Sequence, residues 1–162
     1  MRIAVSACLL GETCRYDGCS KPCARVQELV ALGHELVPIC PEVAGGLPTP
    51  RTPCEIVQAP WMESEKTHTA NEHSWTILDA NGTDRTAAYA RGAQAELARA
   101  KEAGCELAIL KAKSPSCGSG GVYDGTFSGT LVPGWGIAAA AFRDAGITVI
   151  DETADFSRLS RM

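Results

Sequence analysis

Several features common in metal-binding and membrane proteins are missing from this sequence. It has no Cys-x-x-Cys pair, only three histidines, and no apolar run near the roughly 20 residues that cross a bilayer. The missing Cys-x-x-Cys pair weakens zinc-ribbon and thioredoxin-like interpretations. A basic surplus is also missing, because the net charge is -4, so composition does not favour electrostatically driven nucleic-acid binding. A small substrate fits this composition better.

The beginning of the sequence resembles a lipoprotein cleavage site, because small residues precede Ala7 and Cys8. Too few residues come before them to form the charged and apolar regions of a signal peptide. We therefore expect a cytoplasmic protein with no membrane partner.

Cysteine, by contrast, is plentiful. The chain has 162 residues, of which 45% are hydrophobic, so it can bury a proper core as one domain over residues 1–162 without a disulfide scaffold. In a reducing compartment, eight cysteines indicate metal binding or catalysis more than disulfides. They are Cys8, Cys14, Cys19, Cys23, Cys40, Cys54, Cys105 and Cys117.

The hydrophobic pattern predicts alternating strands and helices. Strands are expected at residues 2–7, 35–39, 106–110 and 147–150, and helices between Ser20 and Gly33 and over 85–103 and 137–145. The middle is less regular: 54–57 and 77–82 have extended character, and 63–76 is polar. This order predicts an α/β, three-layer Rossmann-like sandwich around a mainly parallel sheet, with a polar excursion in the middle. The end of the chain from Phe156 is expected to fray or pack on the surface.

Three cysteines follow predicted strands. Cys8 follows the first strand, Cys40 directly follows the second, and Cys117 comes after a six-residue loop that follows the third. Parallel strands end at one edge of a sheet, so these thiols are expected to converge there, although a free cysteine is also a good core residue. Three cysteines without histidine are compatible with zinc, or with an iron–sulfur cluster that leaves one iron open.

The neighbours of these cysteines carry further polar groups. The stretch "CPEVAGGLPTPR" begins at Cys40 and reads as a rigid, exposed loop that carries Glu42 beside the site. Ser114 and Ser116 precede Cys117, and positive charge for a thiolate is available from Arg51, Lys111 and Lys113.

The other cysteine group has spacings close to, but different from, ferredoxin-like runs. Cys14, Cys19 and Cys23 are interpreted as surface or packing residues, with a second metal site as the alternative.

Glycine motifs elsewhere have structural explanations. Residues 134–139 match G-x-G-x-x-A, but the strand before them is weak, so a glycine-eased helix start is favoured over dinucleotide binding. Residues 118–121 lack the Lys-Ser/Thr ending of a P-loop.

Five motifs in order, "SACLLG", "CRYDG", "CPEVAGGLPTPR", "KSPSCG" and "GVYDGTFSG", resemble the thiouracil desulfidase (TudS) family, formerly a domain of unknown function. The resemblance implies a 4Fe-4S cluster with Cys8, Cys40 and Cys117 as its three ligands and one open iron. It implies that Glu42 activates water and that Ser114 assists proton transfer or orientation. We expect Arg51 and Ser116 to bind substrate.

The implied reaction is the non-redox desulfidation of a thiolated pyrimidine, which is thiouracil or its nucleoside or nucleotide. A uracil-type product and hydrogen sulfide would leave. RNA is not the expected substrate of so short and acidic a chain, and cluster-assembly machinery is an expected partner. The alternatives are a structural or regulatory metal-binding module, with zinc or an iron–sulfur cluster, and a persulfide sulfur carrier.

Overall fold

The computed structural model describes residues 1–58 and 75–159. Most of the polar excursion expected at 63–76 lies outside the described residues. The rest of the chain forms one four-stranded sheet, two two-stranded sheets and the helices around them.

The central sheet is parallel, as predicted. Its order is β2-β1-β5-β8, and every neighbouring pair runs in the same direction. The strands are β1 (Arg2–Ser6), β2 (Glu35–Ile39), β5 (Leu107–Leu110) and β8 (Thr148–Asp151), each within a residue or two of its predicted bounds. The order reverses between β1 and β5, which is where ligands bind in open α/β sheets.

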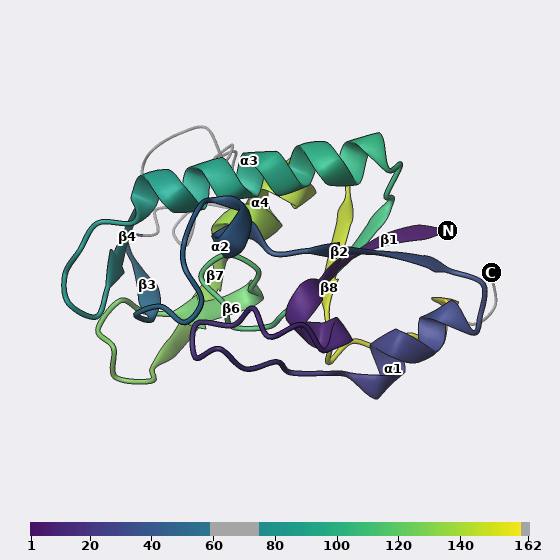
Figure 1. Ribbon diagram of the computed structural model, residues 1–162, viewed down its shortest axis with the longest axis horizontal. Helices are drawn as coiled ribbons and strands as arrows, with labels where there is room; N and C mark the ends of the chain where they lie inside the picture. The colour runs from purple at the N-terminus through teal and green to yellow at the C-terminus, as the bar shows by residue number, and fades with distance from the viewer. Residues whose placement is uncertain (59–74, 160–162) are drawn as a thin grey trace.

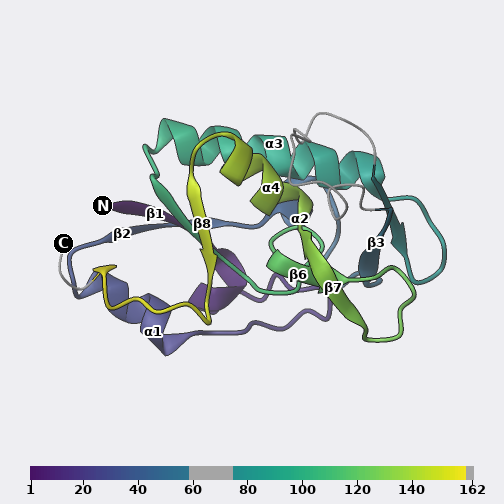
Figure 2. The same ribbon diagram turned by 180° about the vertical axis from the view of Figure 1, so that it is seen from behind.

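Helices cover both faces of the sheet, which confirms the three-layer prediction (Figures 1 and 2). On one face lie α3 (Thr86–Glu102) and α4 (Ile137–Asp144). On the other lie the 3-10 turn η1 (Ala7–Leu10), α1 (Ala24–Gln27) and the turn η2 (Glu28–Val30), so the predicted second element is a much shorter helix than expected. Among the described residues, no helix has the length and apolar character needed to cross a membrane.

The core on each face follows the alternation of side chains along the strands. Ala4 and Ala108 pack with Leu97 and Phe142 of the α3 and α4 layer. Ile3, Val5 and Ile109 point the other way and pack with Val26, Leu29 and Phe156. Phe156 is therefore buried in the core, and the expectation of a frayed or surface-packed end is wrong at this residue.

Two antiparallel pairs lie beside the central sheet. One joins β3 (Cys54–Gln58) to β4 (Thr76–Asp79), and the other is a hairpin of β6 (Ser119–Tyr123) and β7 (Leu131–Trp135). The strand β6 runs through the glycine-rich stretch, which the sequence did not predict as a strand because glycine has a low strand propensity.

The G-x-G-x-x-A segment packs against the Ser114–Cys117 loop. The first N–H groups of α4 donate to the carbonyls of Pro115 and Ser116, with Ile137 N to Pro115 O at 2.9 Å and Ala138 N to Ser116 O at 2.8 Å. A Cβ on Gly136 would overlap the backbone of Ser116. Glycine is therefore needed here for a close backbone contact at the start of α4. This agrees with the structural explanation that the sequence favoured over dinucleotide binding.

The stretch after Cys40 is a short helix, α2 (Pro41–Ala44), packed on α3. The prediction of a loop is wrong at Pro41–Ala44, where two glycines allow the α2 and α3 backbones to touch, whereas residues 43, 44, 46 and 48–50 are exposed as expected. A Cβ on Gly45 would overlap the carbonyl oxygen of Ala88, and a Cβ on Gly92 would overlap that of Pro41. This contact holds the residue after Pro41, Glu42, against the body of the protein.

We predict that Gly92→Ala destabilises the protein and displaces α2. Alanine improves helix propensity by about 1 kcal/mol, but forcing a methyl into a closed backbone contact costs about 1–3 kcal/mol or more. Denaturant unfolding should show a net loss of stability. Ala98→Ser, on the exposed face of the same helix, is the control and should stay within about 0.5 kcal/mol. A Gly92→Ala protein as stable as the parent would contradict the close contact.

Candidate active site

A cavity of about 450 Å³ opens at the carboxyl edge of the parallel sheet. The segments that follow β1, β2 and β5 line it, and the β6–β7 hairpin contributes Tyr123, Phe127 and Gly129. The cavity therefore lies where the reversed strand order places a ligand site.

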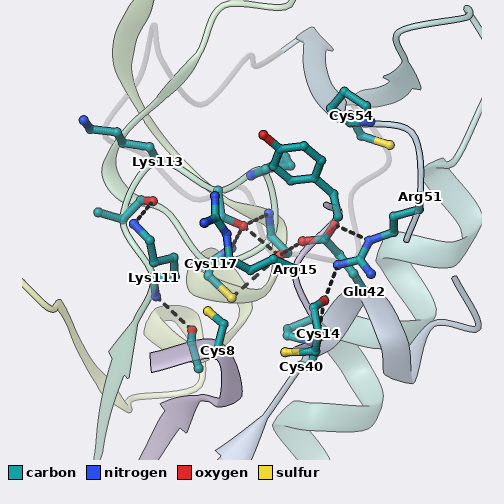
Figure 3. Close-up of a pocket in the computed structure, with 18 of the residues that line it drawn as sticks. Cys8, Cys14, Arg15, Cys40, Glu42, Arg51, Cys54, Lys111, Lys113 and Cys117 are labelled. Atoms are coloured by element: carbon teal, nitrogen blue, oxygen red, sulfur yellow. Dashed lines mark hydrogen bonds and ion pairs between the residues drawn. The ribbon is translucent and has the colours of Figure 1, made fainter. Parts of the chain in front are cut away.

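The three strand-end cysteines all line this cavity (Figure 3). Cys8 lies in η1 directly after β1, Cys40 is the residue before α2, and Cys117 ends the loop after β5. All three are free thiols; Cys8 and Cys117 are buried and Cys40 is half-buried. The predicted convergence is confirmed, and their role as cluster ligands stays a prediction.

The surroundings shift the pKa values of these thiols in opposite directions. Burial raises the pKa of Cys117 to about 12 and that of Cys8 to about 11. The pKa of Cys40 is instead lowered to about 7, chiefly by a hydrogen bond from the Cys14 thiol and further by the Val43 N–H and Arg51. Without a bound metal group, Cys40 is thus the thiol that ionises near neutral pH.

Cys14 is a site residue that sequence reasoning missed. It lines the cavity, and its carbonyl oxygen lies 4.0 Å from Cys40 Sγ. Cys14 also packs against the core that contains Leu9 and Val26, so the interpretation as a packing residue holds but misses its place in the cavity wall. Cys19 is exposed, and Cys23 packs beside the core that contains Val26 and Leu29, so neither contradicts that interpretation.

Glu42 is held in place by donors from three other parts of the chain. Its Oε1 accepts from Arg51 Nε at 3.1 Å and from Tyr89 Oη at 2.9 Å. Its Oε2 accepts from Ser116 Oγ at 2.9 Å. Burial and the nearby Glu42 raise the pKa of Tyr89, so this phenol remains a donor. Tyr89, on α3, was not recognised from the sequence, because nothing local connects it with Glu42.

The Arg51 guanidinium is occupied by the protein itself. Its side chain is only 5% exposed, and beyond Glu42 it donates to the carbonyls of Cys14 at 2.8 Å and Pro48 at 3.1 Å. Arg51 thereby joins α2 to the loop that carries Cys14. Its contact with substrate stays a prediction.

The two serines before Cys117 form a hydrogen-bonded chain that ends on Glu42. Ser114 Oγ accepts the N–H groups of Ser116 at 3.2 Å and Cys117 at 3.1 Å, which closes the turn. The two serine Oγ atoms are 3.0 Å apart. Because the single Ser116 hydroxyl proton goes to Glu42, Ser114 is the donor to Ser116. The chain thus runs from the cavity wall to the carboxylate.

The lysines contribute unequally to the site. Lys111 Nζ pairs with Glu152 Oε1 at 2.6 Å, and this charge lowers the pKa of Cys8 less than burial raises it. Lys113 lines the cavity and is exposed. Both lysines expected near the thiols line the cavity, but the charge of Lys111 is largely neutralised by Glu152.

The described residues hold no group of three or more His, Cys, Asp or Glu side chains gathered closely enough for one metal ion. The three strand-end thiols lie around the cavity wall. A soft, sulfur-rich set of side chains beside a hydrogen-bonded carboxylate defines a thiol-lined site in an α/β protein.

Comparison with known proteins identifies the family to which the chain belongs. The chain belongs to the 2-thiouracil desulfurase family, whose model matches residues 3–154. The uncharacterized protein YbbK of Bacillus subtilis (strain 168) is 43% identical over 150 residues, which cover 93% of this chain and 95% of that protein. A solved structure of the 4Fe-4S-dependent thiouracil desulfidase TudS is similar with a TM-score of 0.77 and 40% identity, covering 94% of this chain and 91% of that one.

We predict that Cys40 is the first of the three thiols to react in metal-free protein. Its iodoacetamide labelling, followed by mass spectrometry, should rise through pH 7, whereas Cys8 and Cys117 should stay protonated and largely unlabelled below about pH 9. Cys14→Ala is the matched variant, because it removes the principal donor and should move the Cys40 midpoint to higher pH. A Cys40 midpoint near the ordinary thiol value of about 8.5 in the parent would contradict this environment.

Proposed function

We propose that residues 1–162 act as one cytoplasmic domain that binds a 4Fe-4S cluster through Cys8, Cys40 and Cys117 and removes sulfur from a thiolated pyrimidine. The substrate is thiouracil or its nucleoside or nucleotide, and the products are a uracil-type base and hydrogen sulfide. One observation carries the proposal: the three strand-end thiols line the same cavity as Glu42, whose two oxygens are held by three donors. Family membership and the similarity to TudS support it.

The residues around the cavity fit such a cluster. Thiolate is the ligand that iron–sulfur clusters use, and the three thiols come from separate segments around a cavity of about 450 Å³. A zinc ion would need its sulfurs about 2.3 Å from a single point. Three thiols around one cavity of this size supply the sulfur ligands for a larger inorganic group, which cluster-assembly machinery would supply.

A cluster with three protein ligands supplies an iron with a free coordination position, a soft Lewis acid that favours sulfur over oxygen. The reaction replaces C=S with C=O: water provides the oxygen and two protons, and sulfur leaves as hydrogen sulfide. No electrons are gained or lost overall. The net charge of -4 supports a small substrate over RNA.

Glu42 Oε2 is the atom we assign as general base. Oε1 already accepts two hydrogen bonds, from Arg51 and Tyr89, whereas Oε2 accepts one, from Ser116. A carboxylate oxygen has room for two donors, so Oε2 can also accept a water molecule in the cavity. Removing a proton from that water as it attacks the thiocarbonyl carbon would leave the proton on Oε2.

The serine chain gives that proton a route back to the cavity. Once Oε2 is protonated, it can donate to Ser116 Oγ, which then donates to Ser114 Oγ as that oxygen releases one of the two backbone N–H groups that it accepts. Ser114 lines the cavity and can then donate to the departing sulfur. In this proposal Ser116 carries the proton between Glu42 and Ser114, and Arg51 acts through Glu42, which it positions.

The direct test is anaerobic purification or reconstitution, followed by a sulfide-release screen. The protein should be brown and contain about four irons and four sulfides per chain. Thiolated bases, nucleosides and nucleotides are supplied without a reductant, and sulfide should appear with an equal amount of uracil-type product. A colourless protein stoichiometric in zinc would contradict the cofactor, and sulfide release by iron-free protein would indicate a persulfide carrier.

Glu42→Gln separates catalysis from metal binding in this test. The amide keeps the size of the side chain but cannot take a proton, so sulfide release should fall about 100-fold or more while iron content stays at the parent level. Glu35→Gln, an exposed carboxylate on β2, is the control and should keep full activity. Full iron content without turnover in the parent protein would indicate a structural or regulatory metal module.

We predict that Ser116→Ala slows sulfide release without loss of iron. It breaks the chain between Ser114 and Glu42 but leaves the hydrogen bonds that Ser114 accepts from the backbone. A loss of kcat of about 10-fold or more is expected, with little added loss in the Ser114→Ala, Ser116→Ala double variant, since both belong to one route. Ser119→Ala on β6 is the control. Parental kcat in Ser116→Ala would contradict the relay.

A further inference from the structure

The tip of the β6–β7 hairpin, residues 124–130, carries an aromatic ring at the cavity. Phe127 lines the cavity and has φ of +55°. Among the described residues, the non-glycine residues with positive φ are Phe127 and Lys113, and both line this cavity. A bulky residue rarely adopts this conformation, and such strain persists where the surrounding structure enforces it.

A buried carboxylate enforces it here. Glu55, on β3, is 9% exposed, and its Oε1 accepts the N–H groups of Gly125 at 3.0 Å and Phe127 at 3.2 Å. Gly125 lies so close to β3 that a Cβ on it would be 2.7 Å from the carbonyl oxygen of Ile56. The hairpin tip is thereby docked on β3, at the end of the molecule where both ribbon views place it (Figures 1 and 2).

Folding alone does not explain the phenylalanine. Phe127 is 39% exposed, so the ring gains little from burial, and glycine at this position would avoid the strain. What the ring does is complete a cavity wall to which Tyr16 and Tyr123 also belong. Aromatic rings that line a cavity are suited to stacking on a flat, heteroaromatic molecule.

We propose that Phe127 stacks on the planar ring of the substrate and that Glu55 is the positioning residue that holds it there. This inference rests on the proposed function, since it names the contact that recognises the pyrimidine ring. Glu55 acts through the backbone of the hairpin tip and takes no part in the proton transfer assigned to Glu42. A stacking contact is made equally in the ground state and the transition state, so it contributes to KM and not to kcat.

The test uses the reconstituted holoprotein with three Phe127 and Glu55 changes. Phe127→Gly should raise KM for thiouracil about 10-fold with kcat nearly unchanged, because base–aromatic stacking is lost. Its melting temperature should not fall, because glycine accepts positive φ. Phe127→Tyr keeps an aromatic ring at this position and should have the parental KM. Glu55→Ala should raise KM by a similar factor, and the Phe127→Gly, Glu55→Ala double variant should show no further rise.

Two further variants keep the result interpretable. Glu55→Gln retains an oxygen that can accept both N–H groups and should keep the parental KM, so it separates positioning from loss of a buried side chain. Leu131→Ala removes an exposed apolar side chain on the same hairpin outside the cavity wall and should leave KM unchanged. If Glu55→Ala does not fold, the KM values of Phe127→Gly and Phe127→Tyr are sufficient to test the stacking contact. An unchanged KM in Phe127→Gly overturns the inference.

Calorimetric titration of 4-thiouracil into the same holoproteins separates this inference from the proposed function. A parent protein that binds 4-thiouracil more tightly than Phe127→Gly but releases no sulfide would contradict the desulfidase function and support the stacking contact. Sulfide release with equal dissociation constants in the two proteins would support the function and overturn the contact. A parent that neither binds nor converts thiouracil would contradict both.

Discussion

Parallel pairing of β1 with β2 and β5 is the constraint on which this site depends. The pairing aligns Ser6 with Ile39 and Val5 with Ile109, so the chain leaves all three strands at one edge. Cys8 and Cys40 follow within two residues of the last paired positions, and the short loop after β5 brings Cys117 back to the same place. Thiols far apart in sequence thus meet because backbone hydrogen bonds fix the direction of every strand.

Close backbone contacts then fix the polar groups beside the thiols. Gly45 and Gly92 let α2 touch α3, which brings Glu42 within reach of Tyr89. Gly136 allows the start of α4 to bind the loop of Ser116, which donates to the other oxygen of Glu42. Each glycine is required because two backbones approach too closely for a Cβ. Together these contacts place the donors around the Glu42 carboxylate.

The surroundings of the cavity thiols set their protonation, and protonation in turn affects metal binding. Burial favours the protonated forms of Cys8 and Cys117, whereas the Cys14 thiol, the Val43 N–H and Arg51 favour the ionised form of Cys40. Metal ligands must be thiolates, so loading a metal group has to displace the protons of the two buried thiols. Burial therefore opposes an empty, triply ionised site and keeps Cys8 and Cys117 protonated until a bound positive group replaces their protons.

Local sequence was enough for the elements that depend on hydrophobic periodicity. The strand at 35–39 and the long alanine-rich helix lie where the pattern places them, and Cys8, Cys40, Cys117 and Glu42 follow from their positions just after strands. The helix α2 and the hairpin strand β6 did not follow, because proline and glycine resemble loop residues unless their packing partners are known. Tyr89, Cys14 and Glu55 were missed for a related reason: their partners are distant in the chain.

The sequence by itself determined the α/β alternation and the residues that follow its strands, because side-chain periodicity and turn chemistry act over a few neighbours. The tertiary structure decided which groups surround those residues. It set the donors to Glu42, placed Cys14 against Cys40, and docked the hairpin tip on Glu55. These contacts join segments tens of residues apart, and only the folded backbone fixes the distances between them.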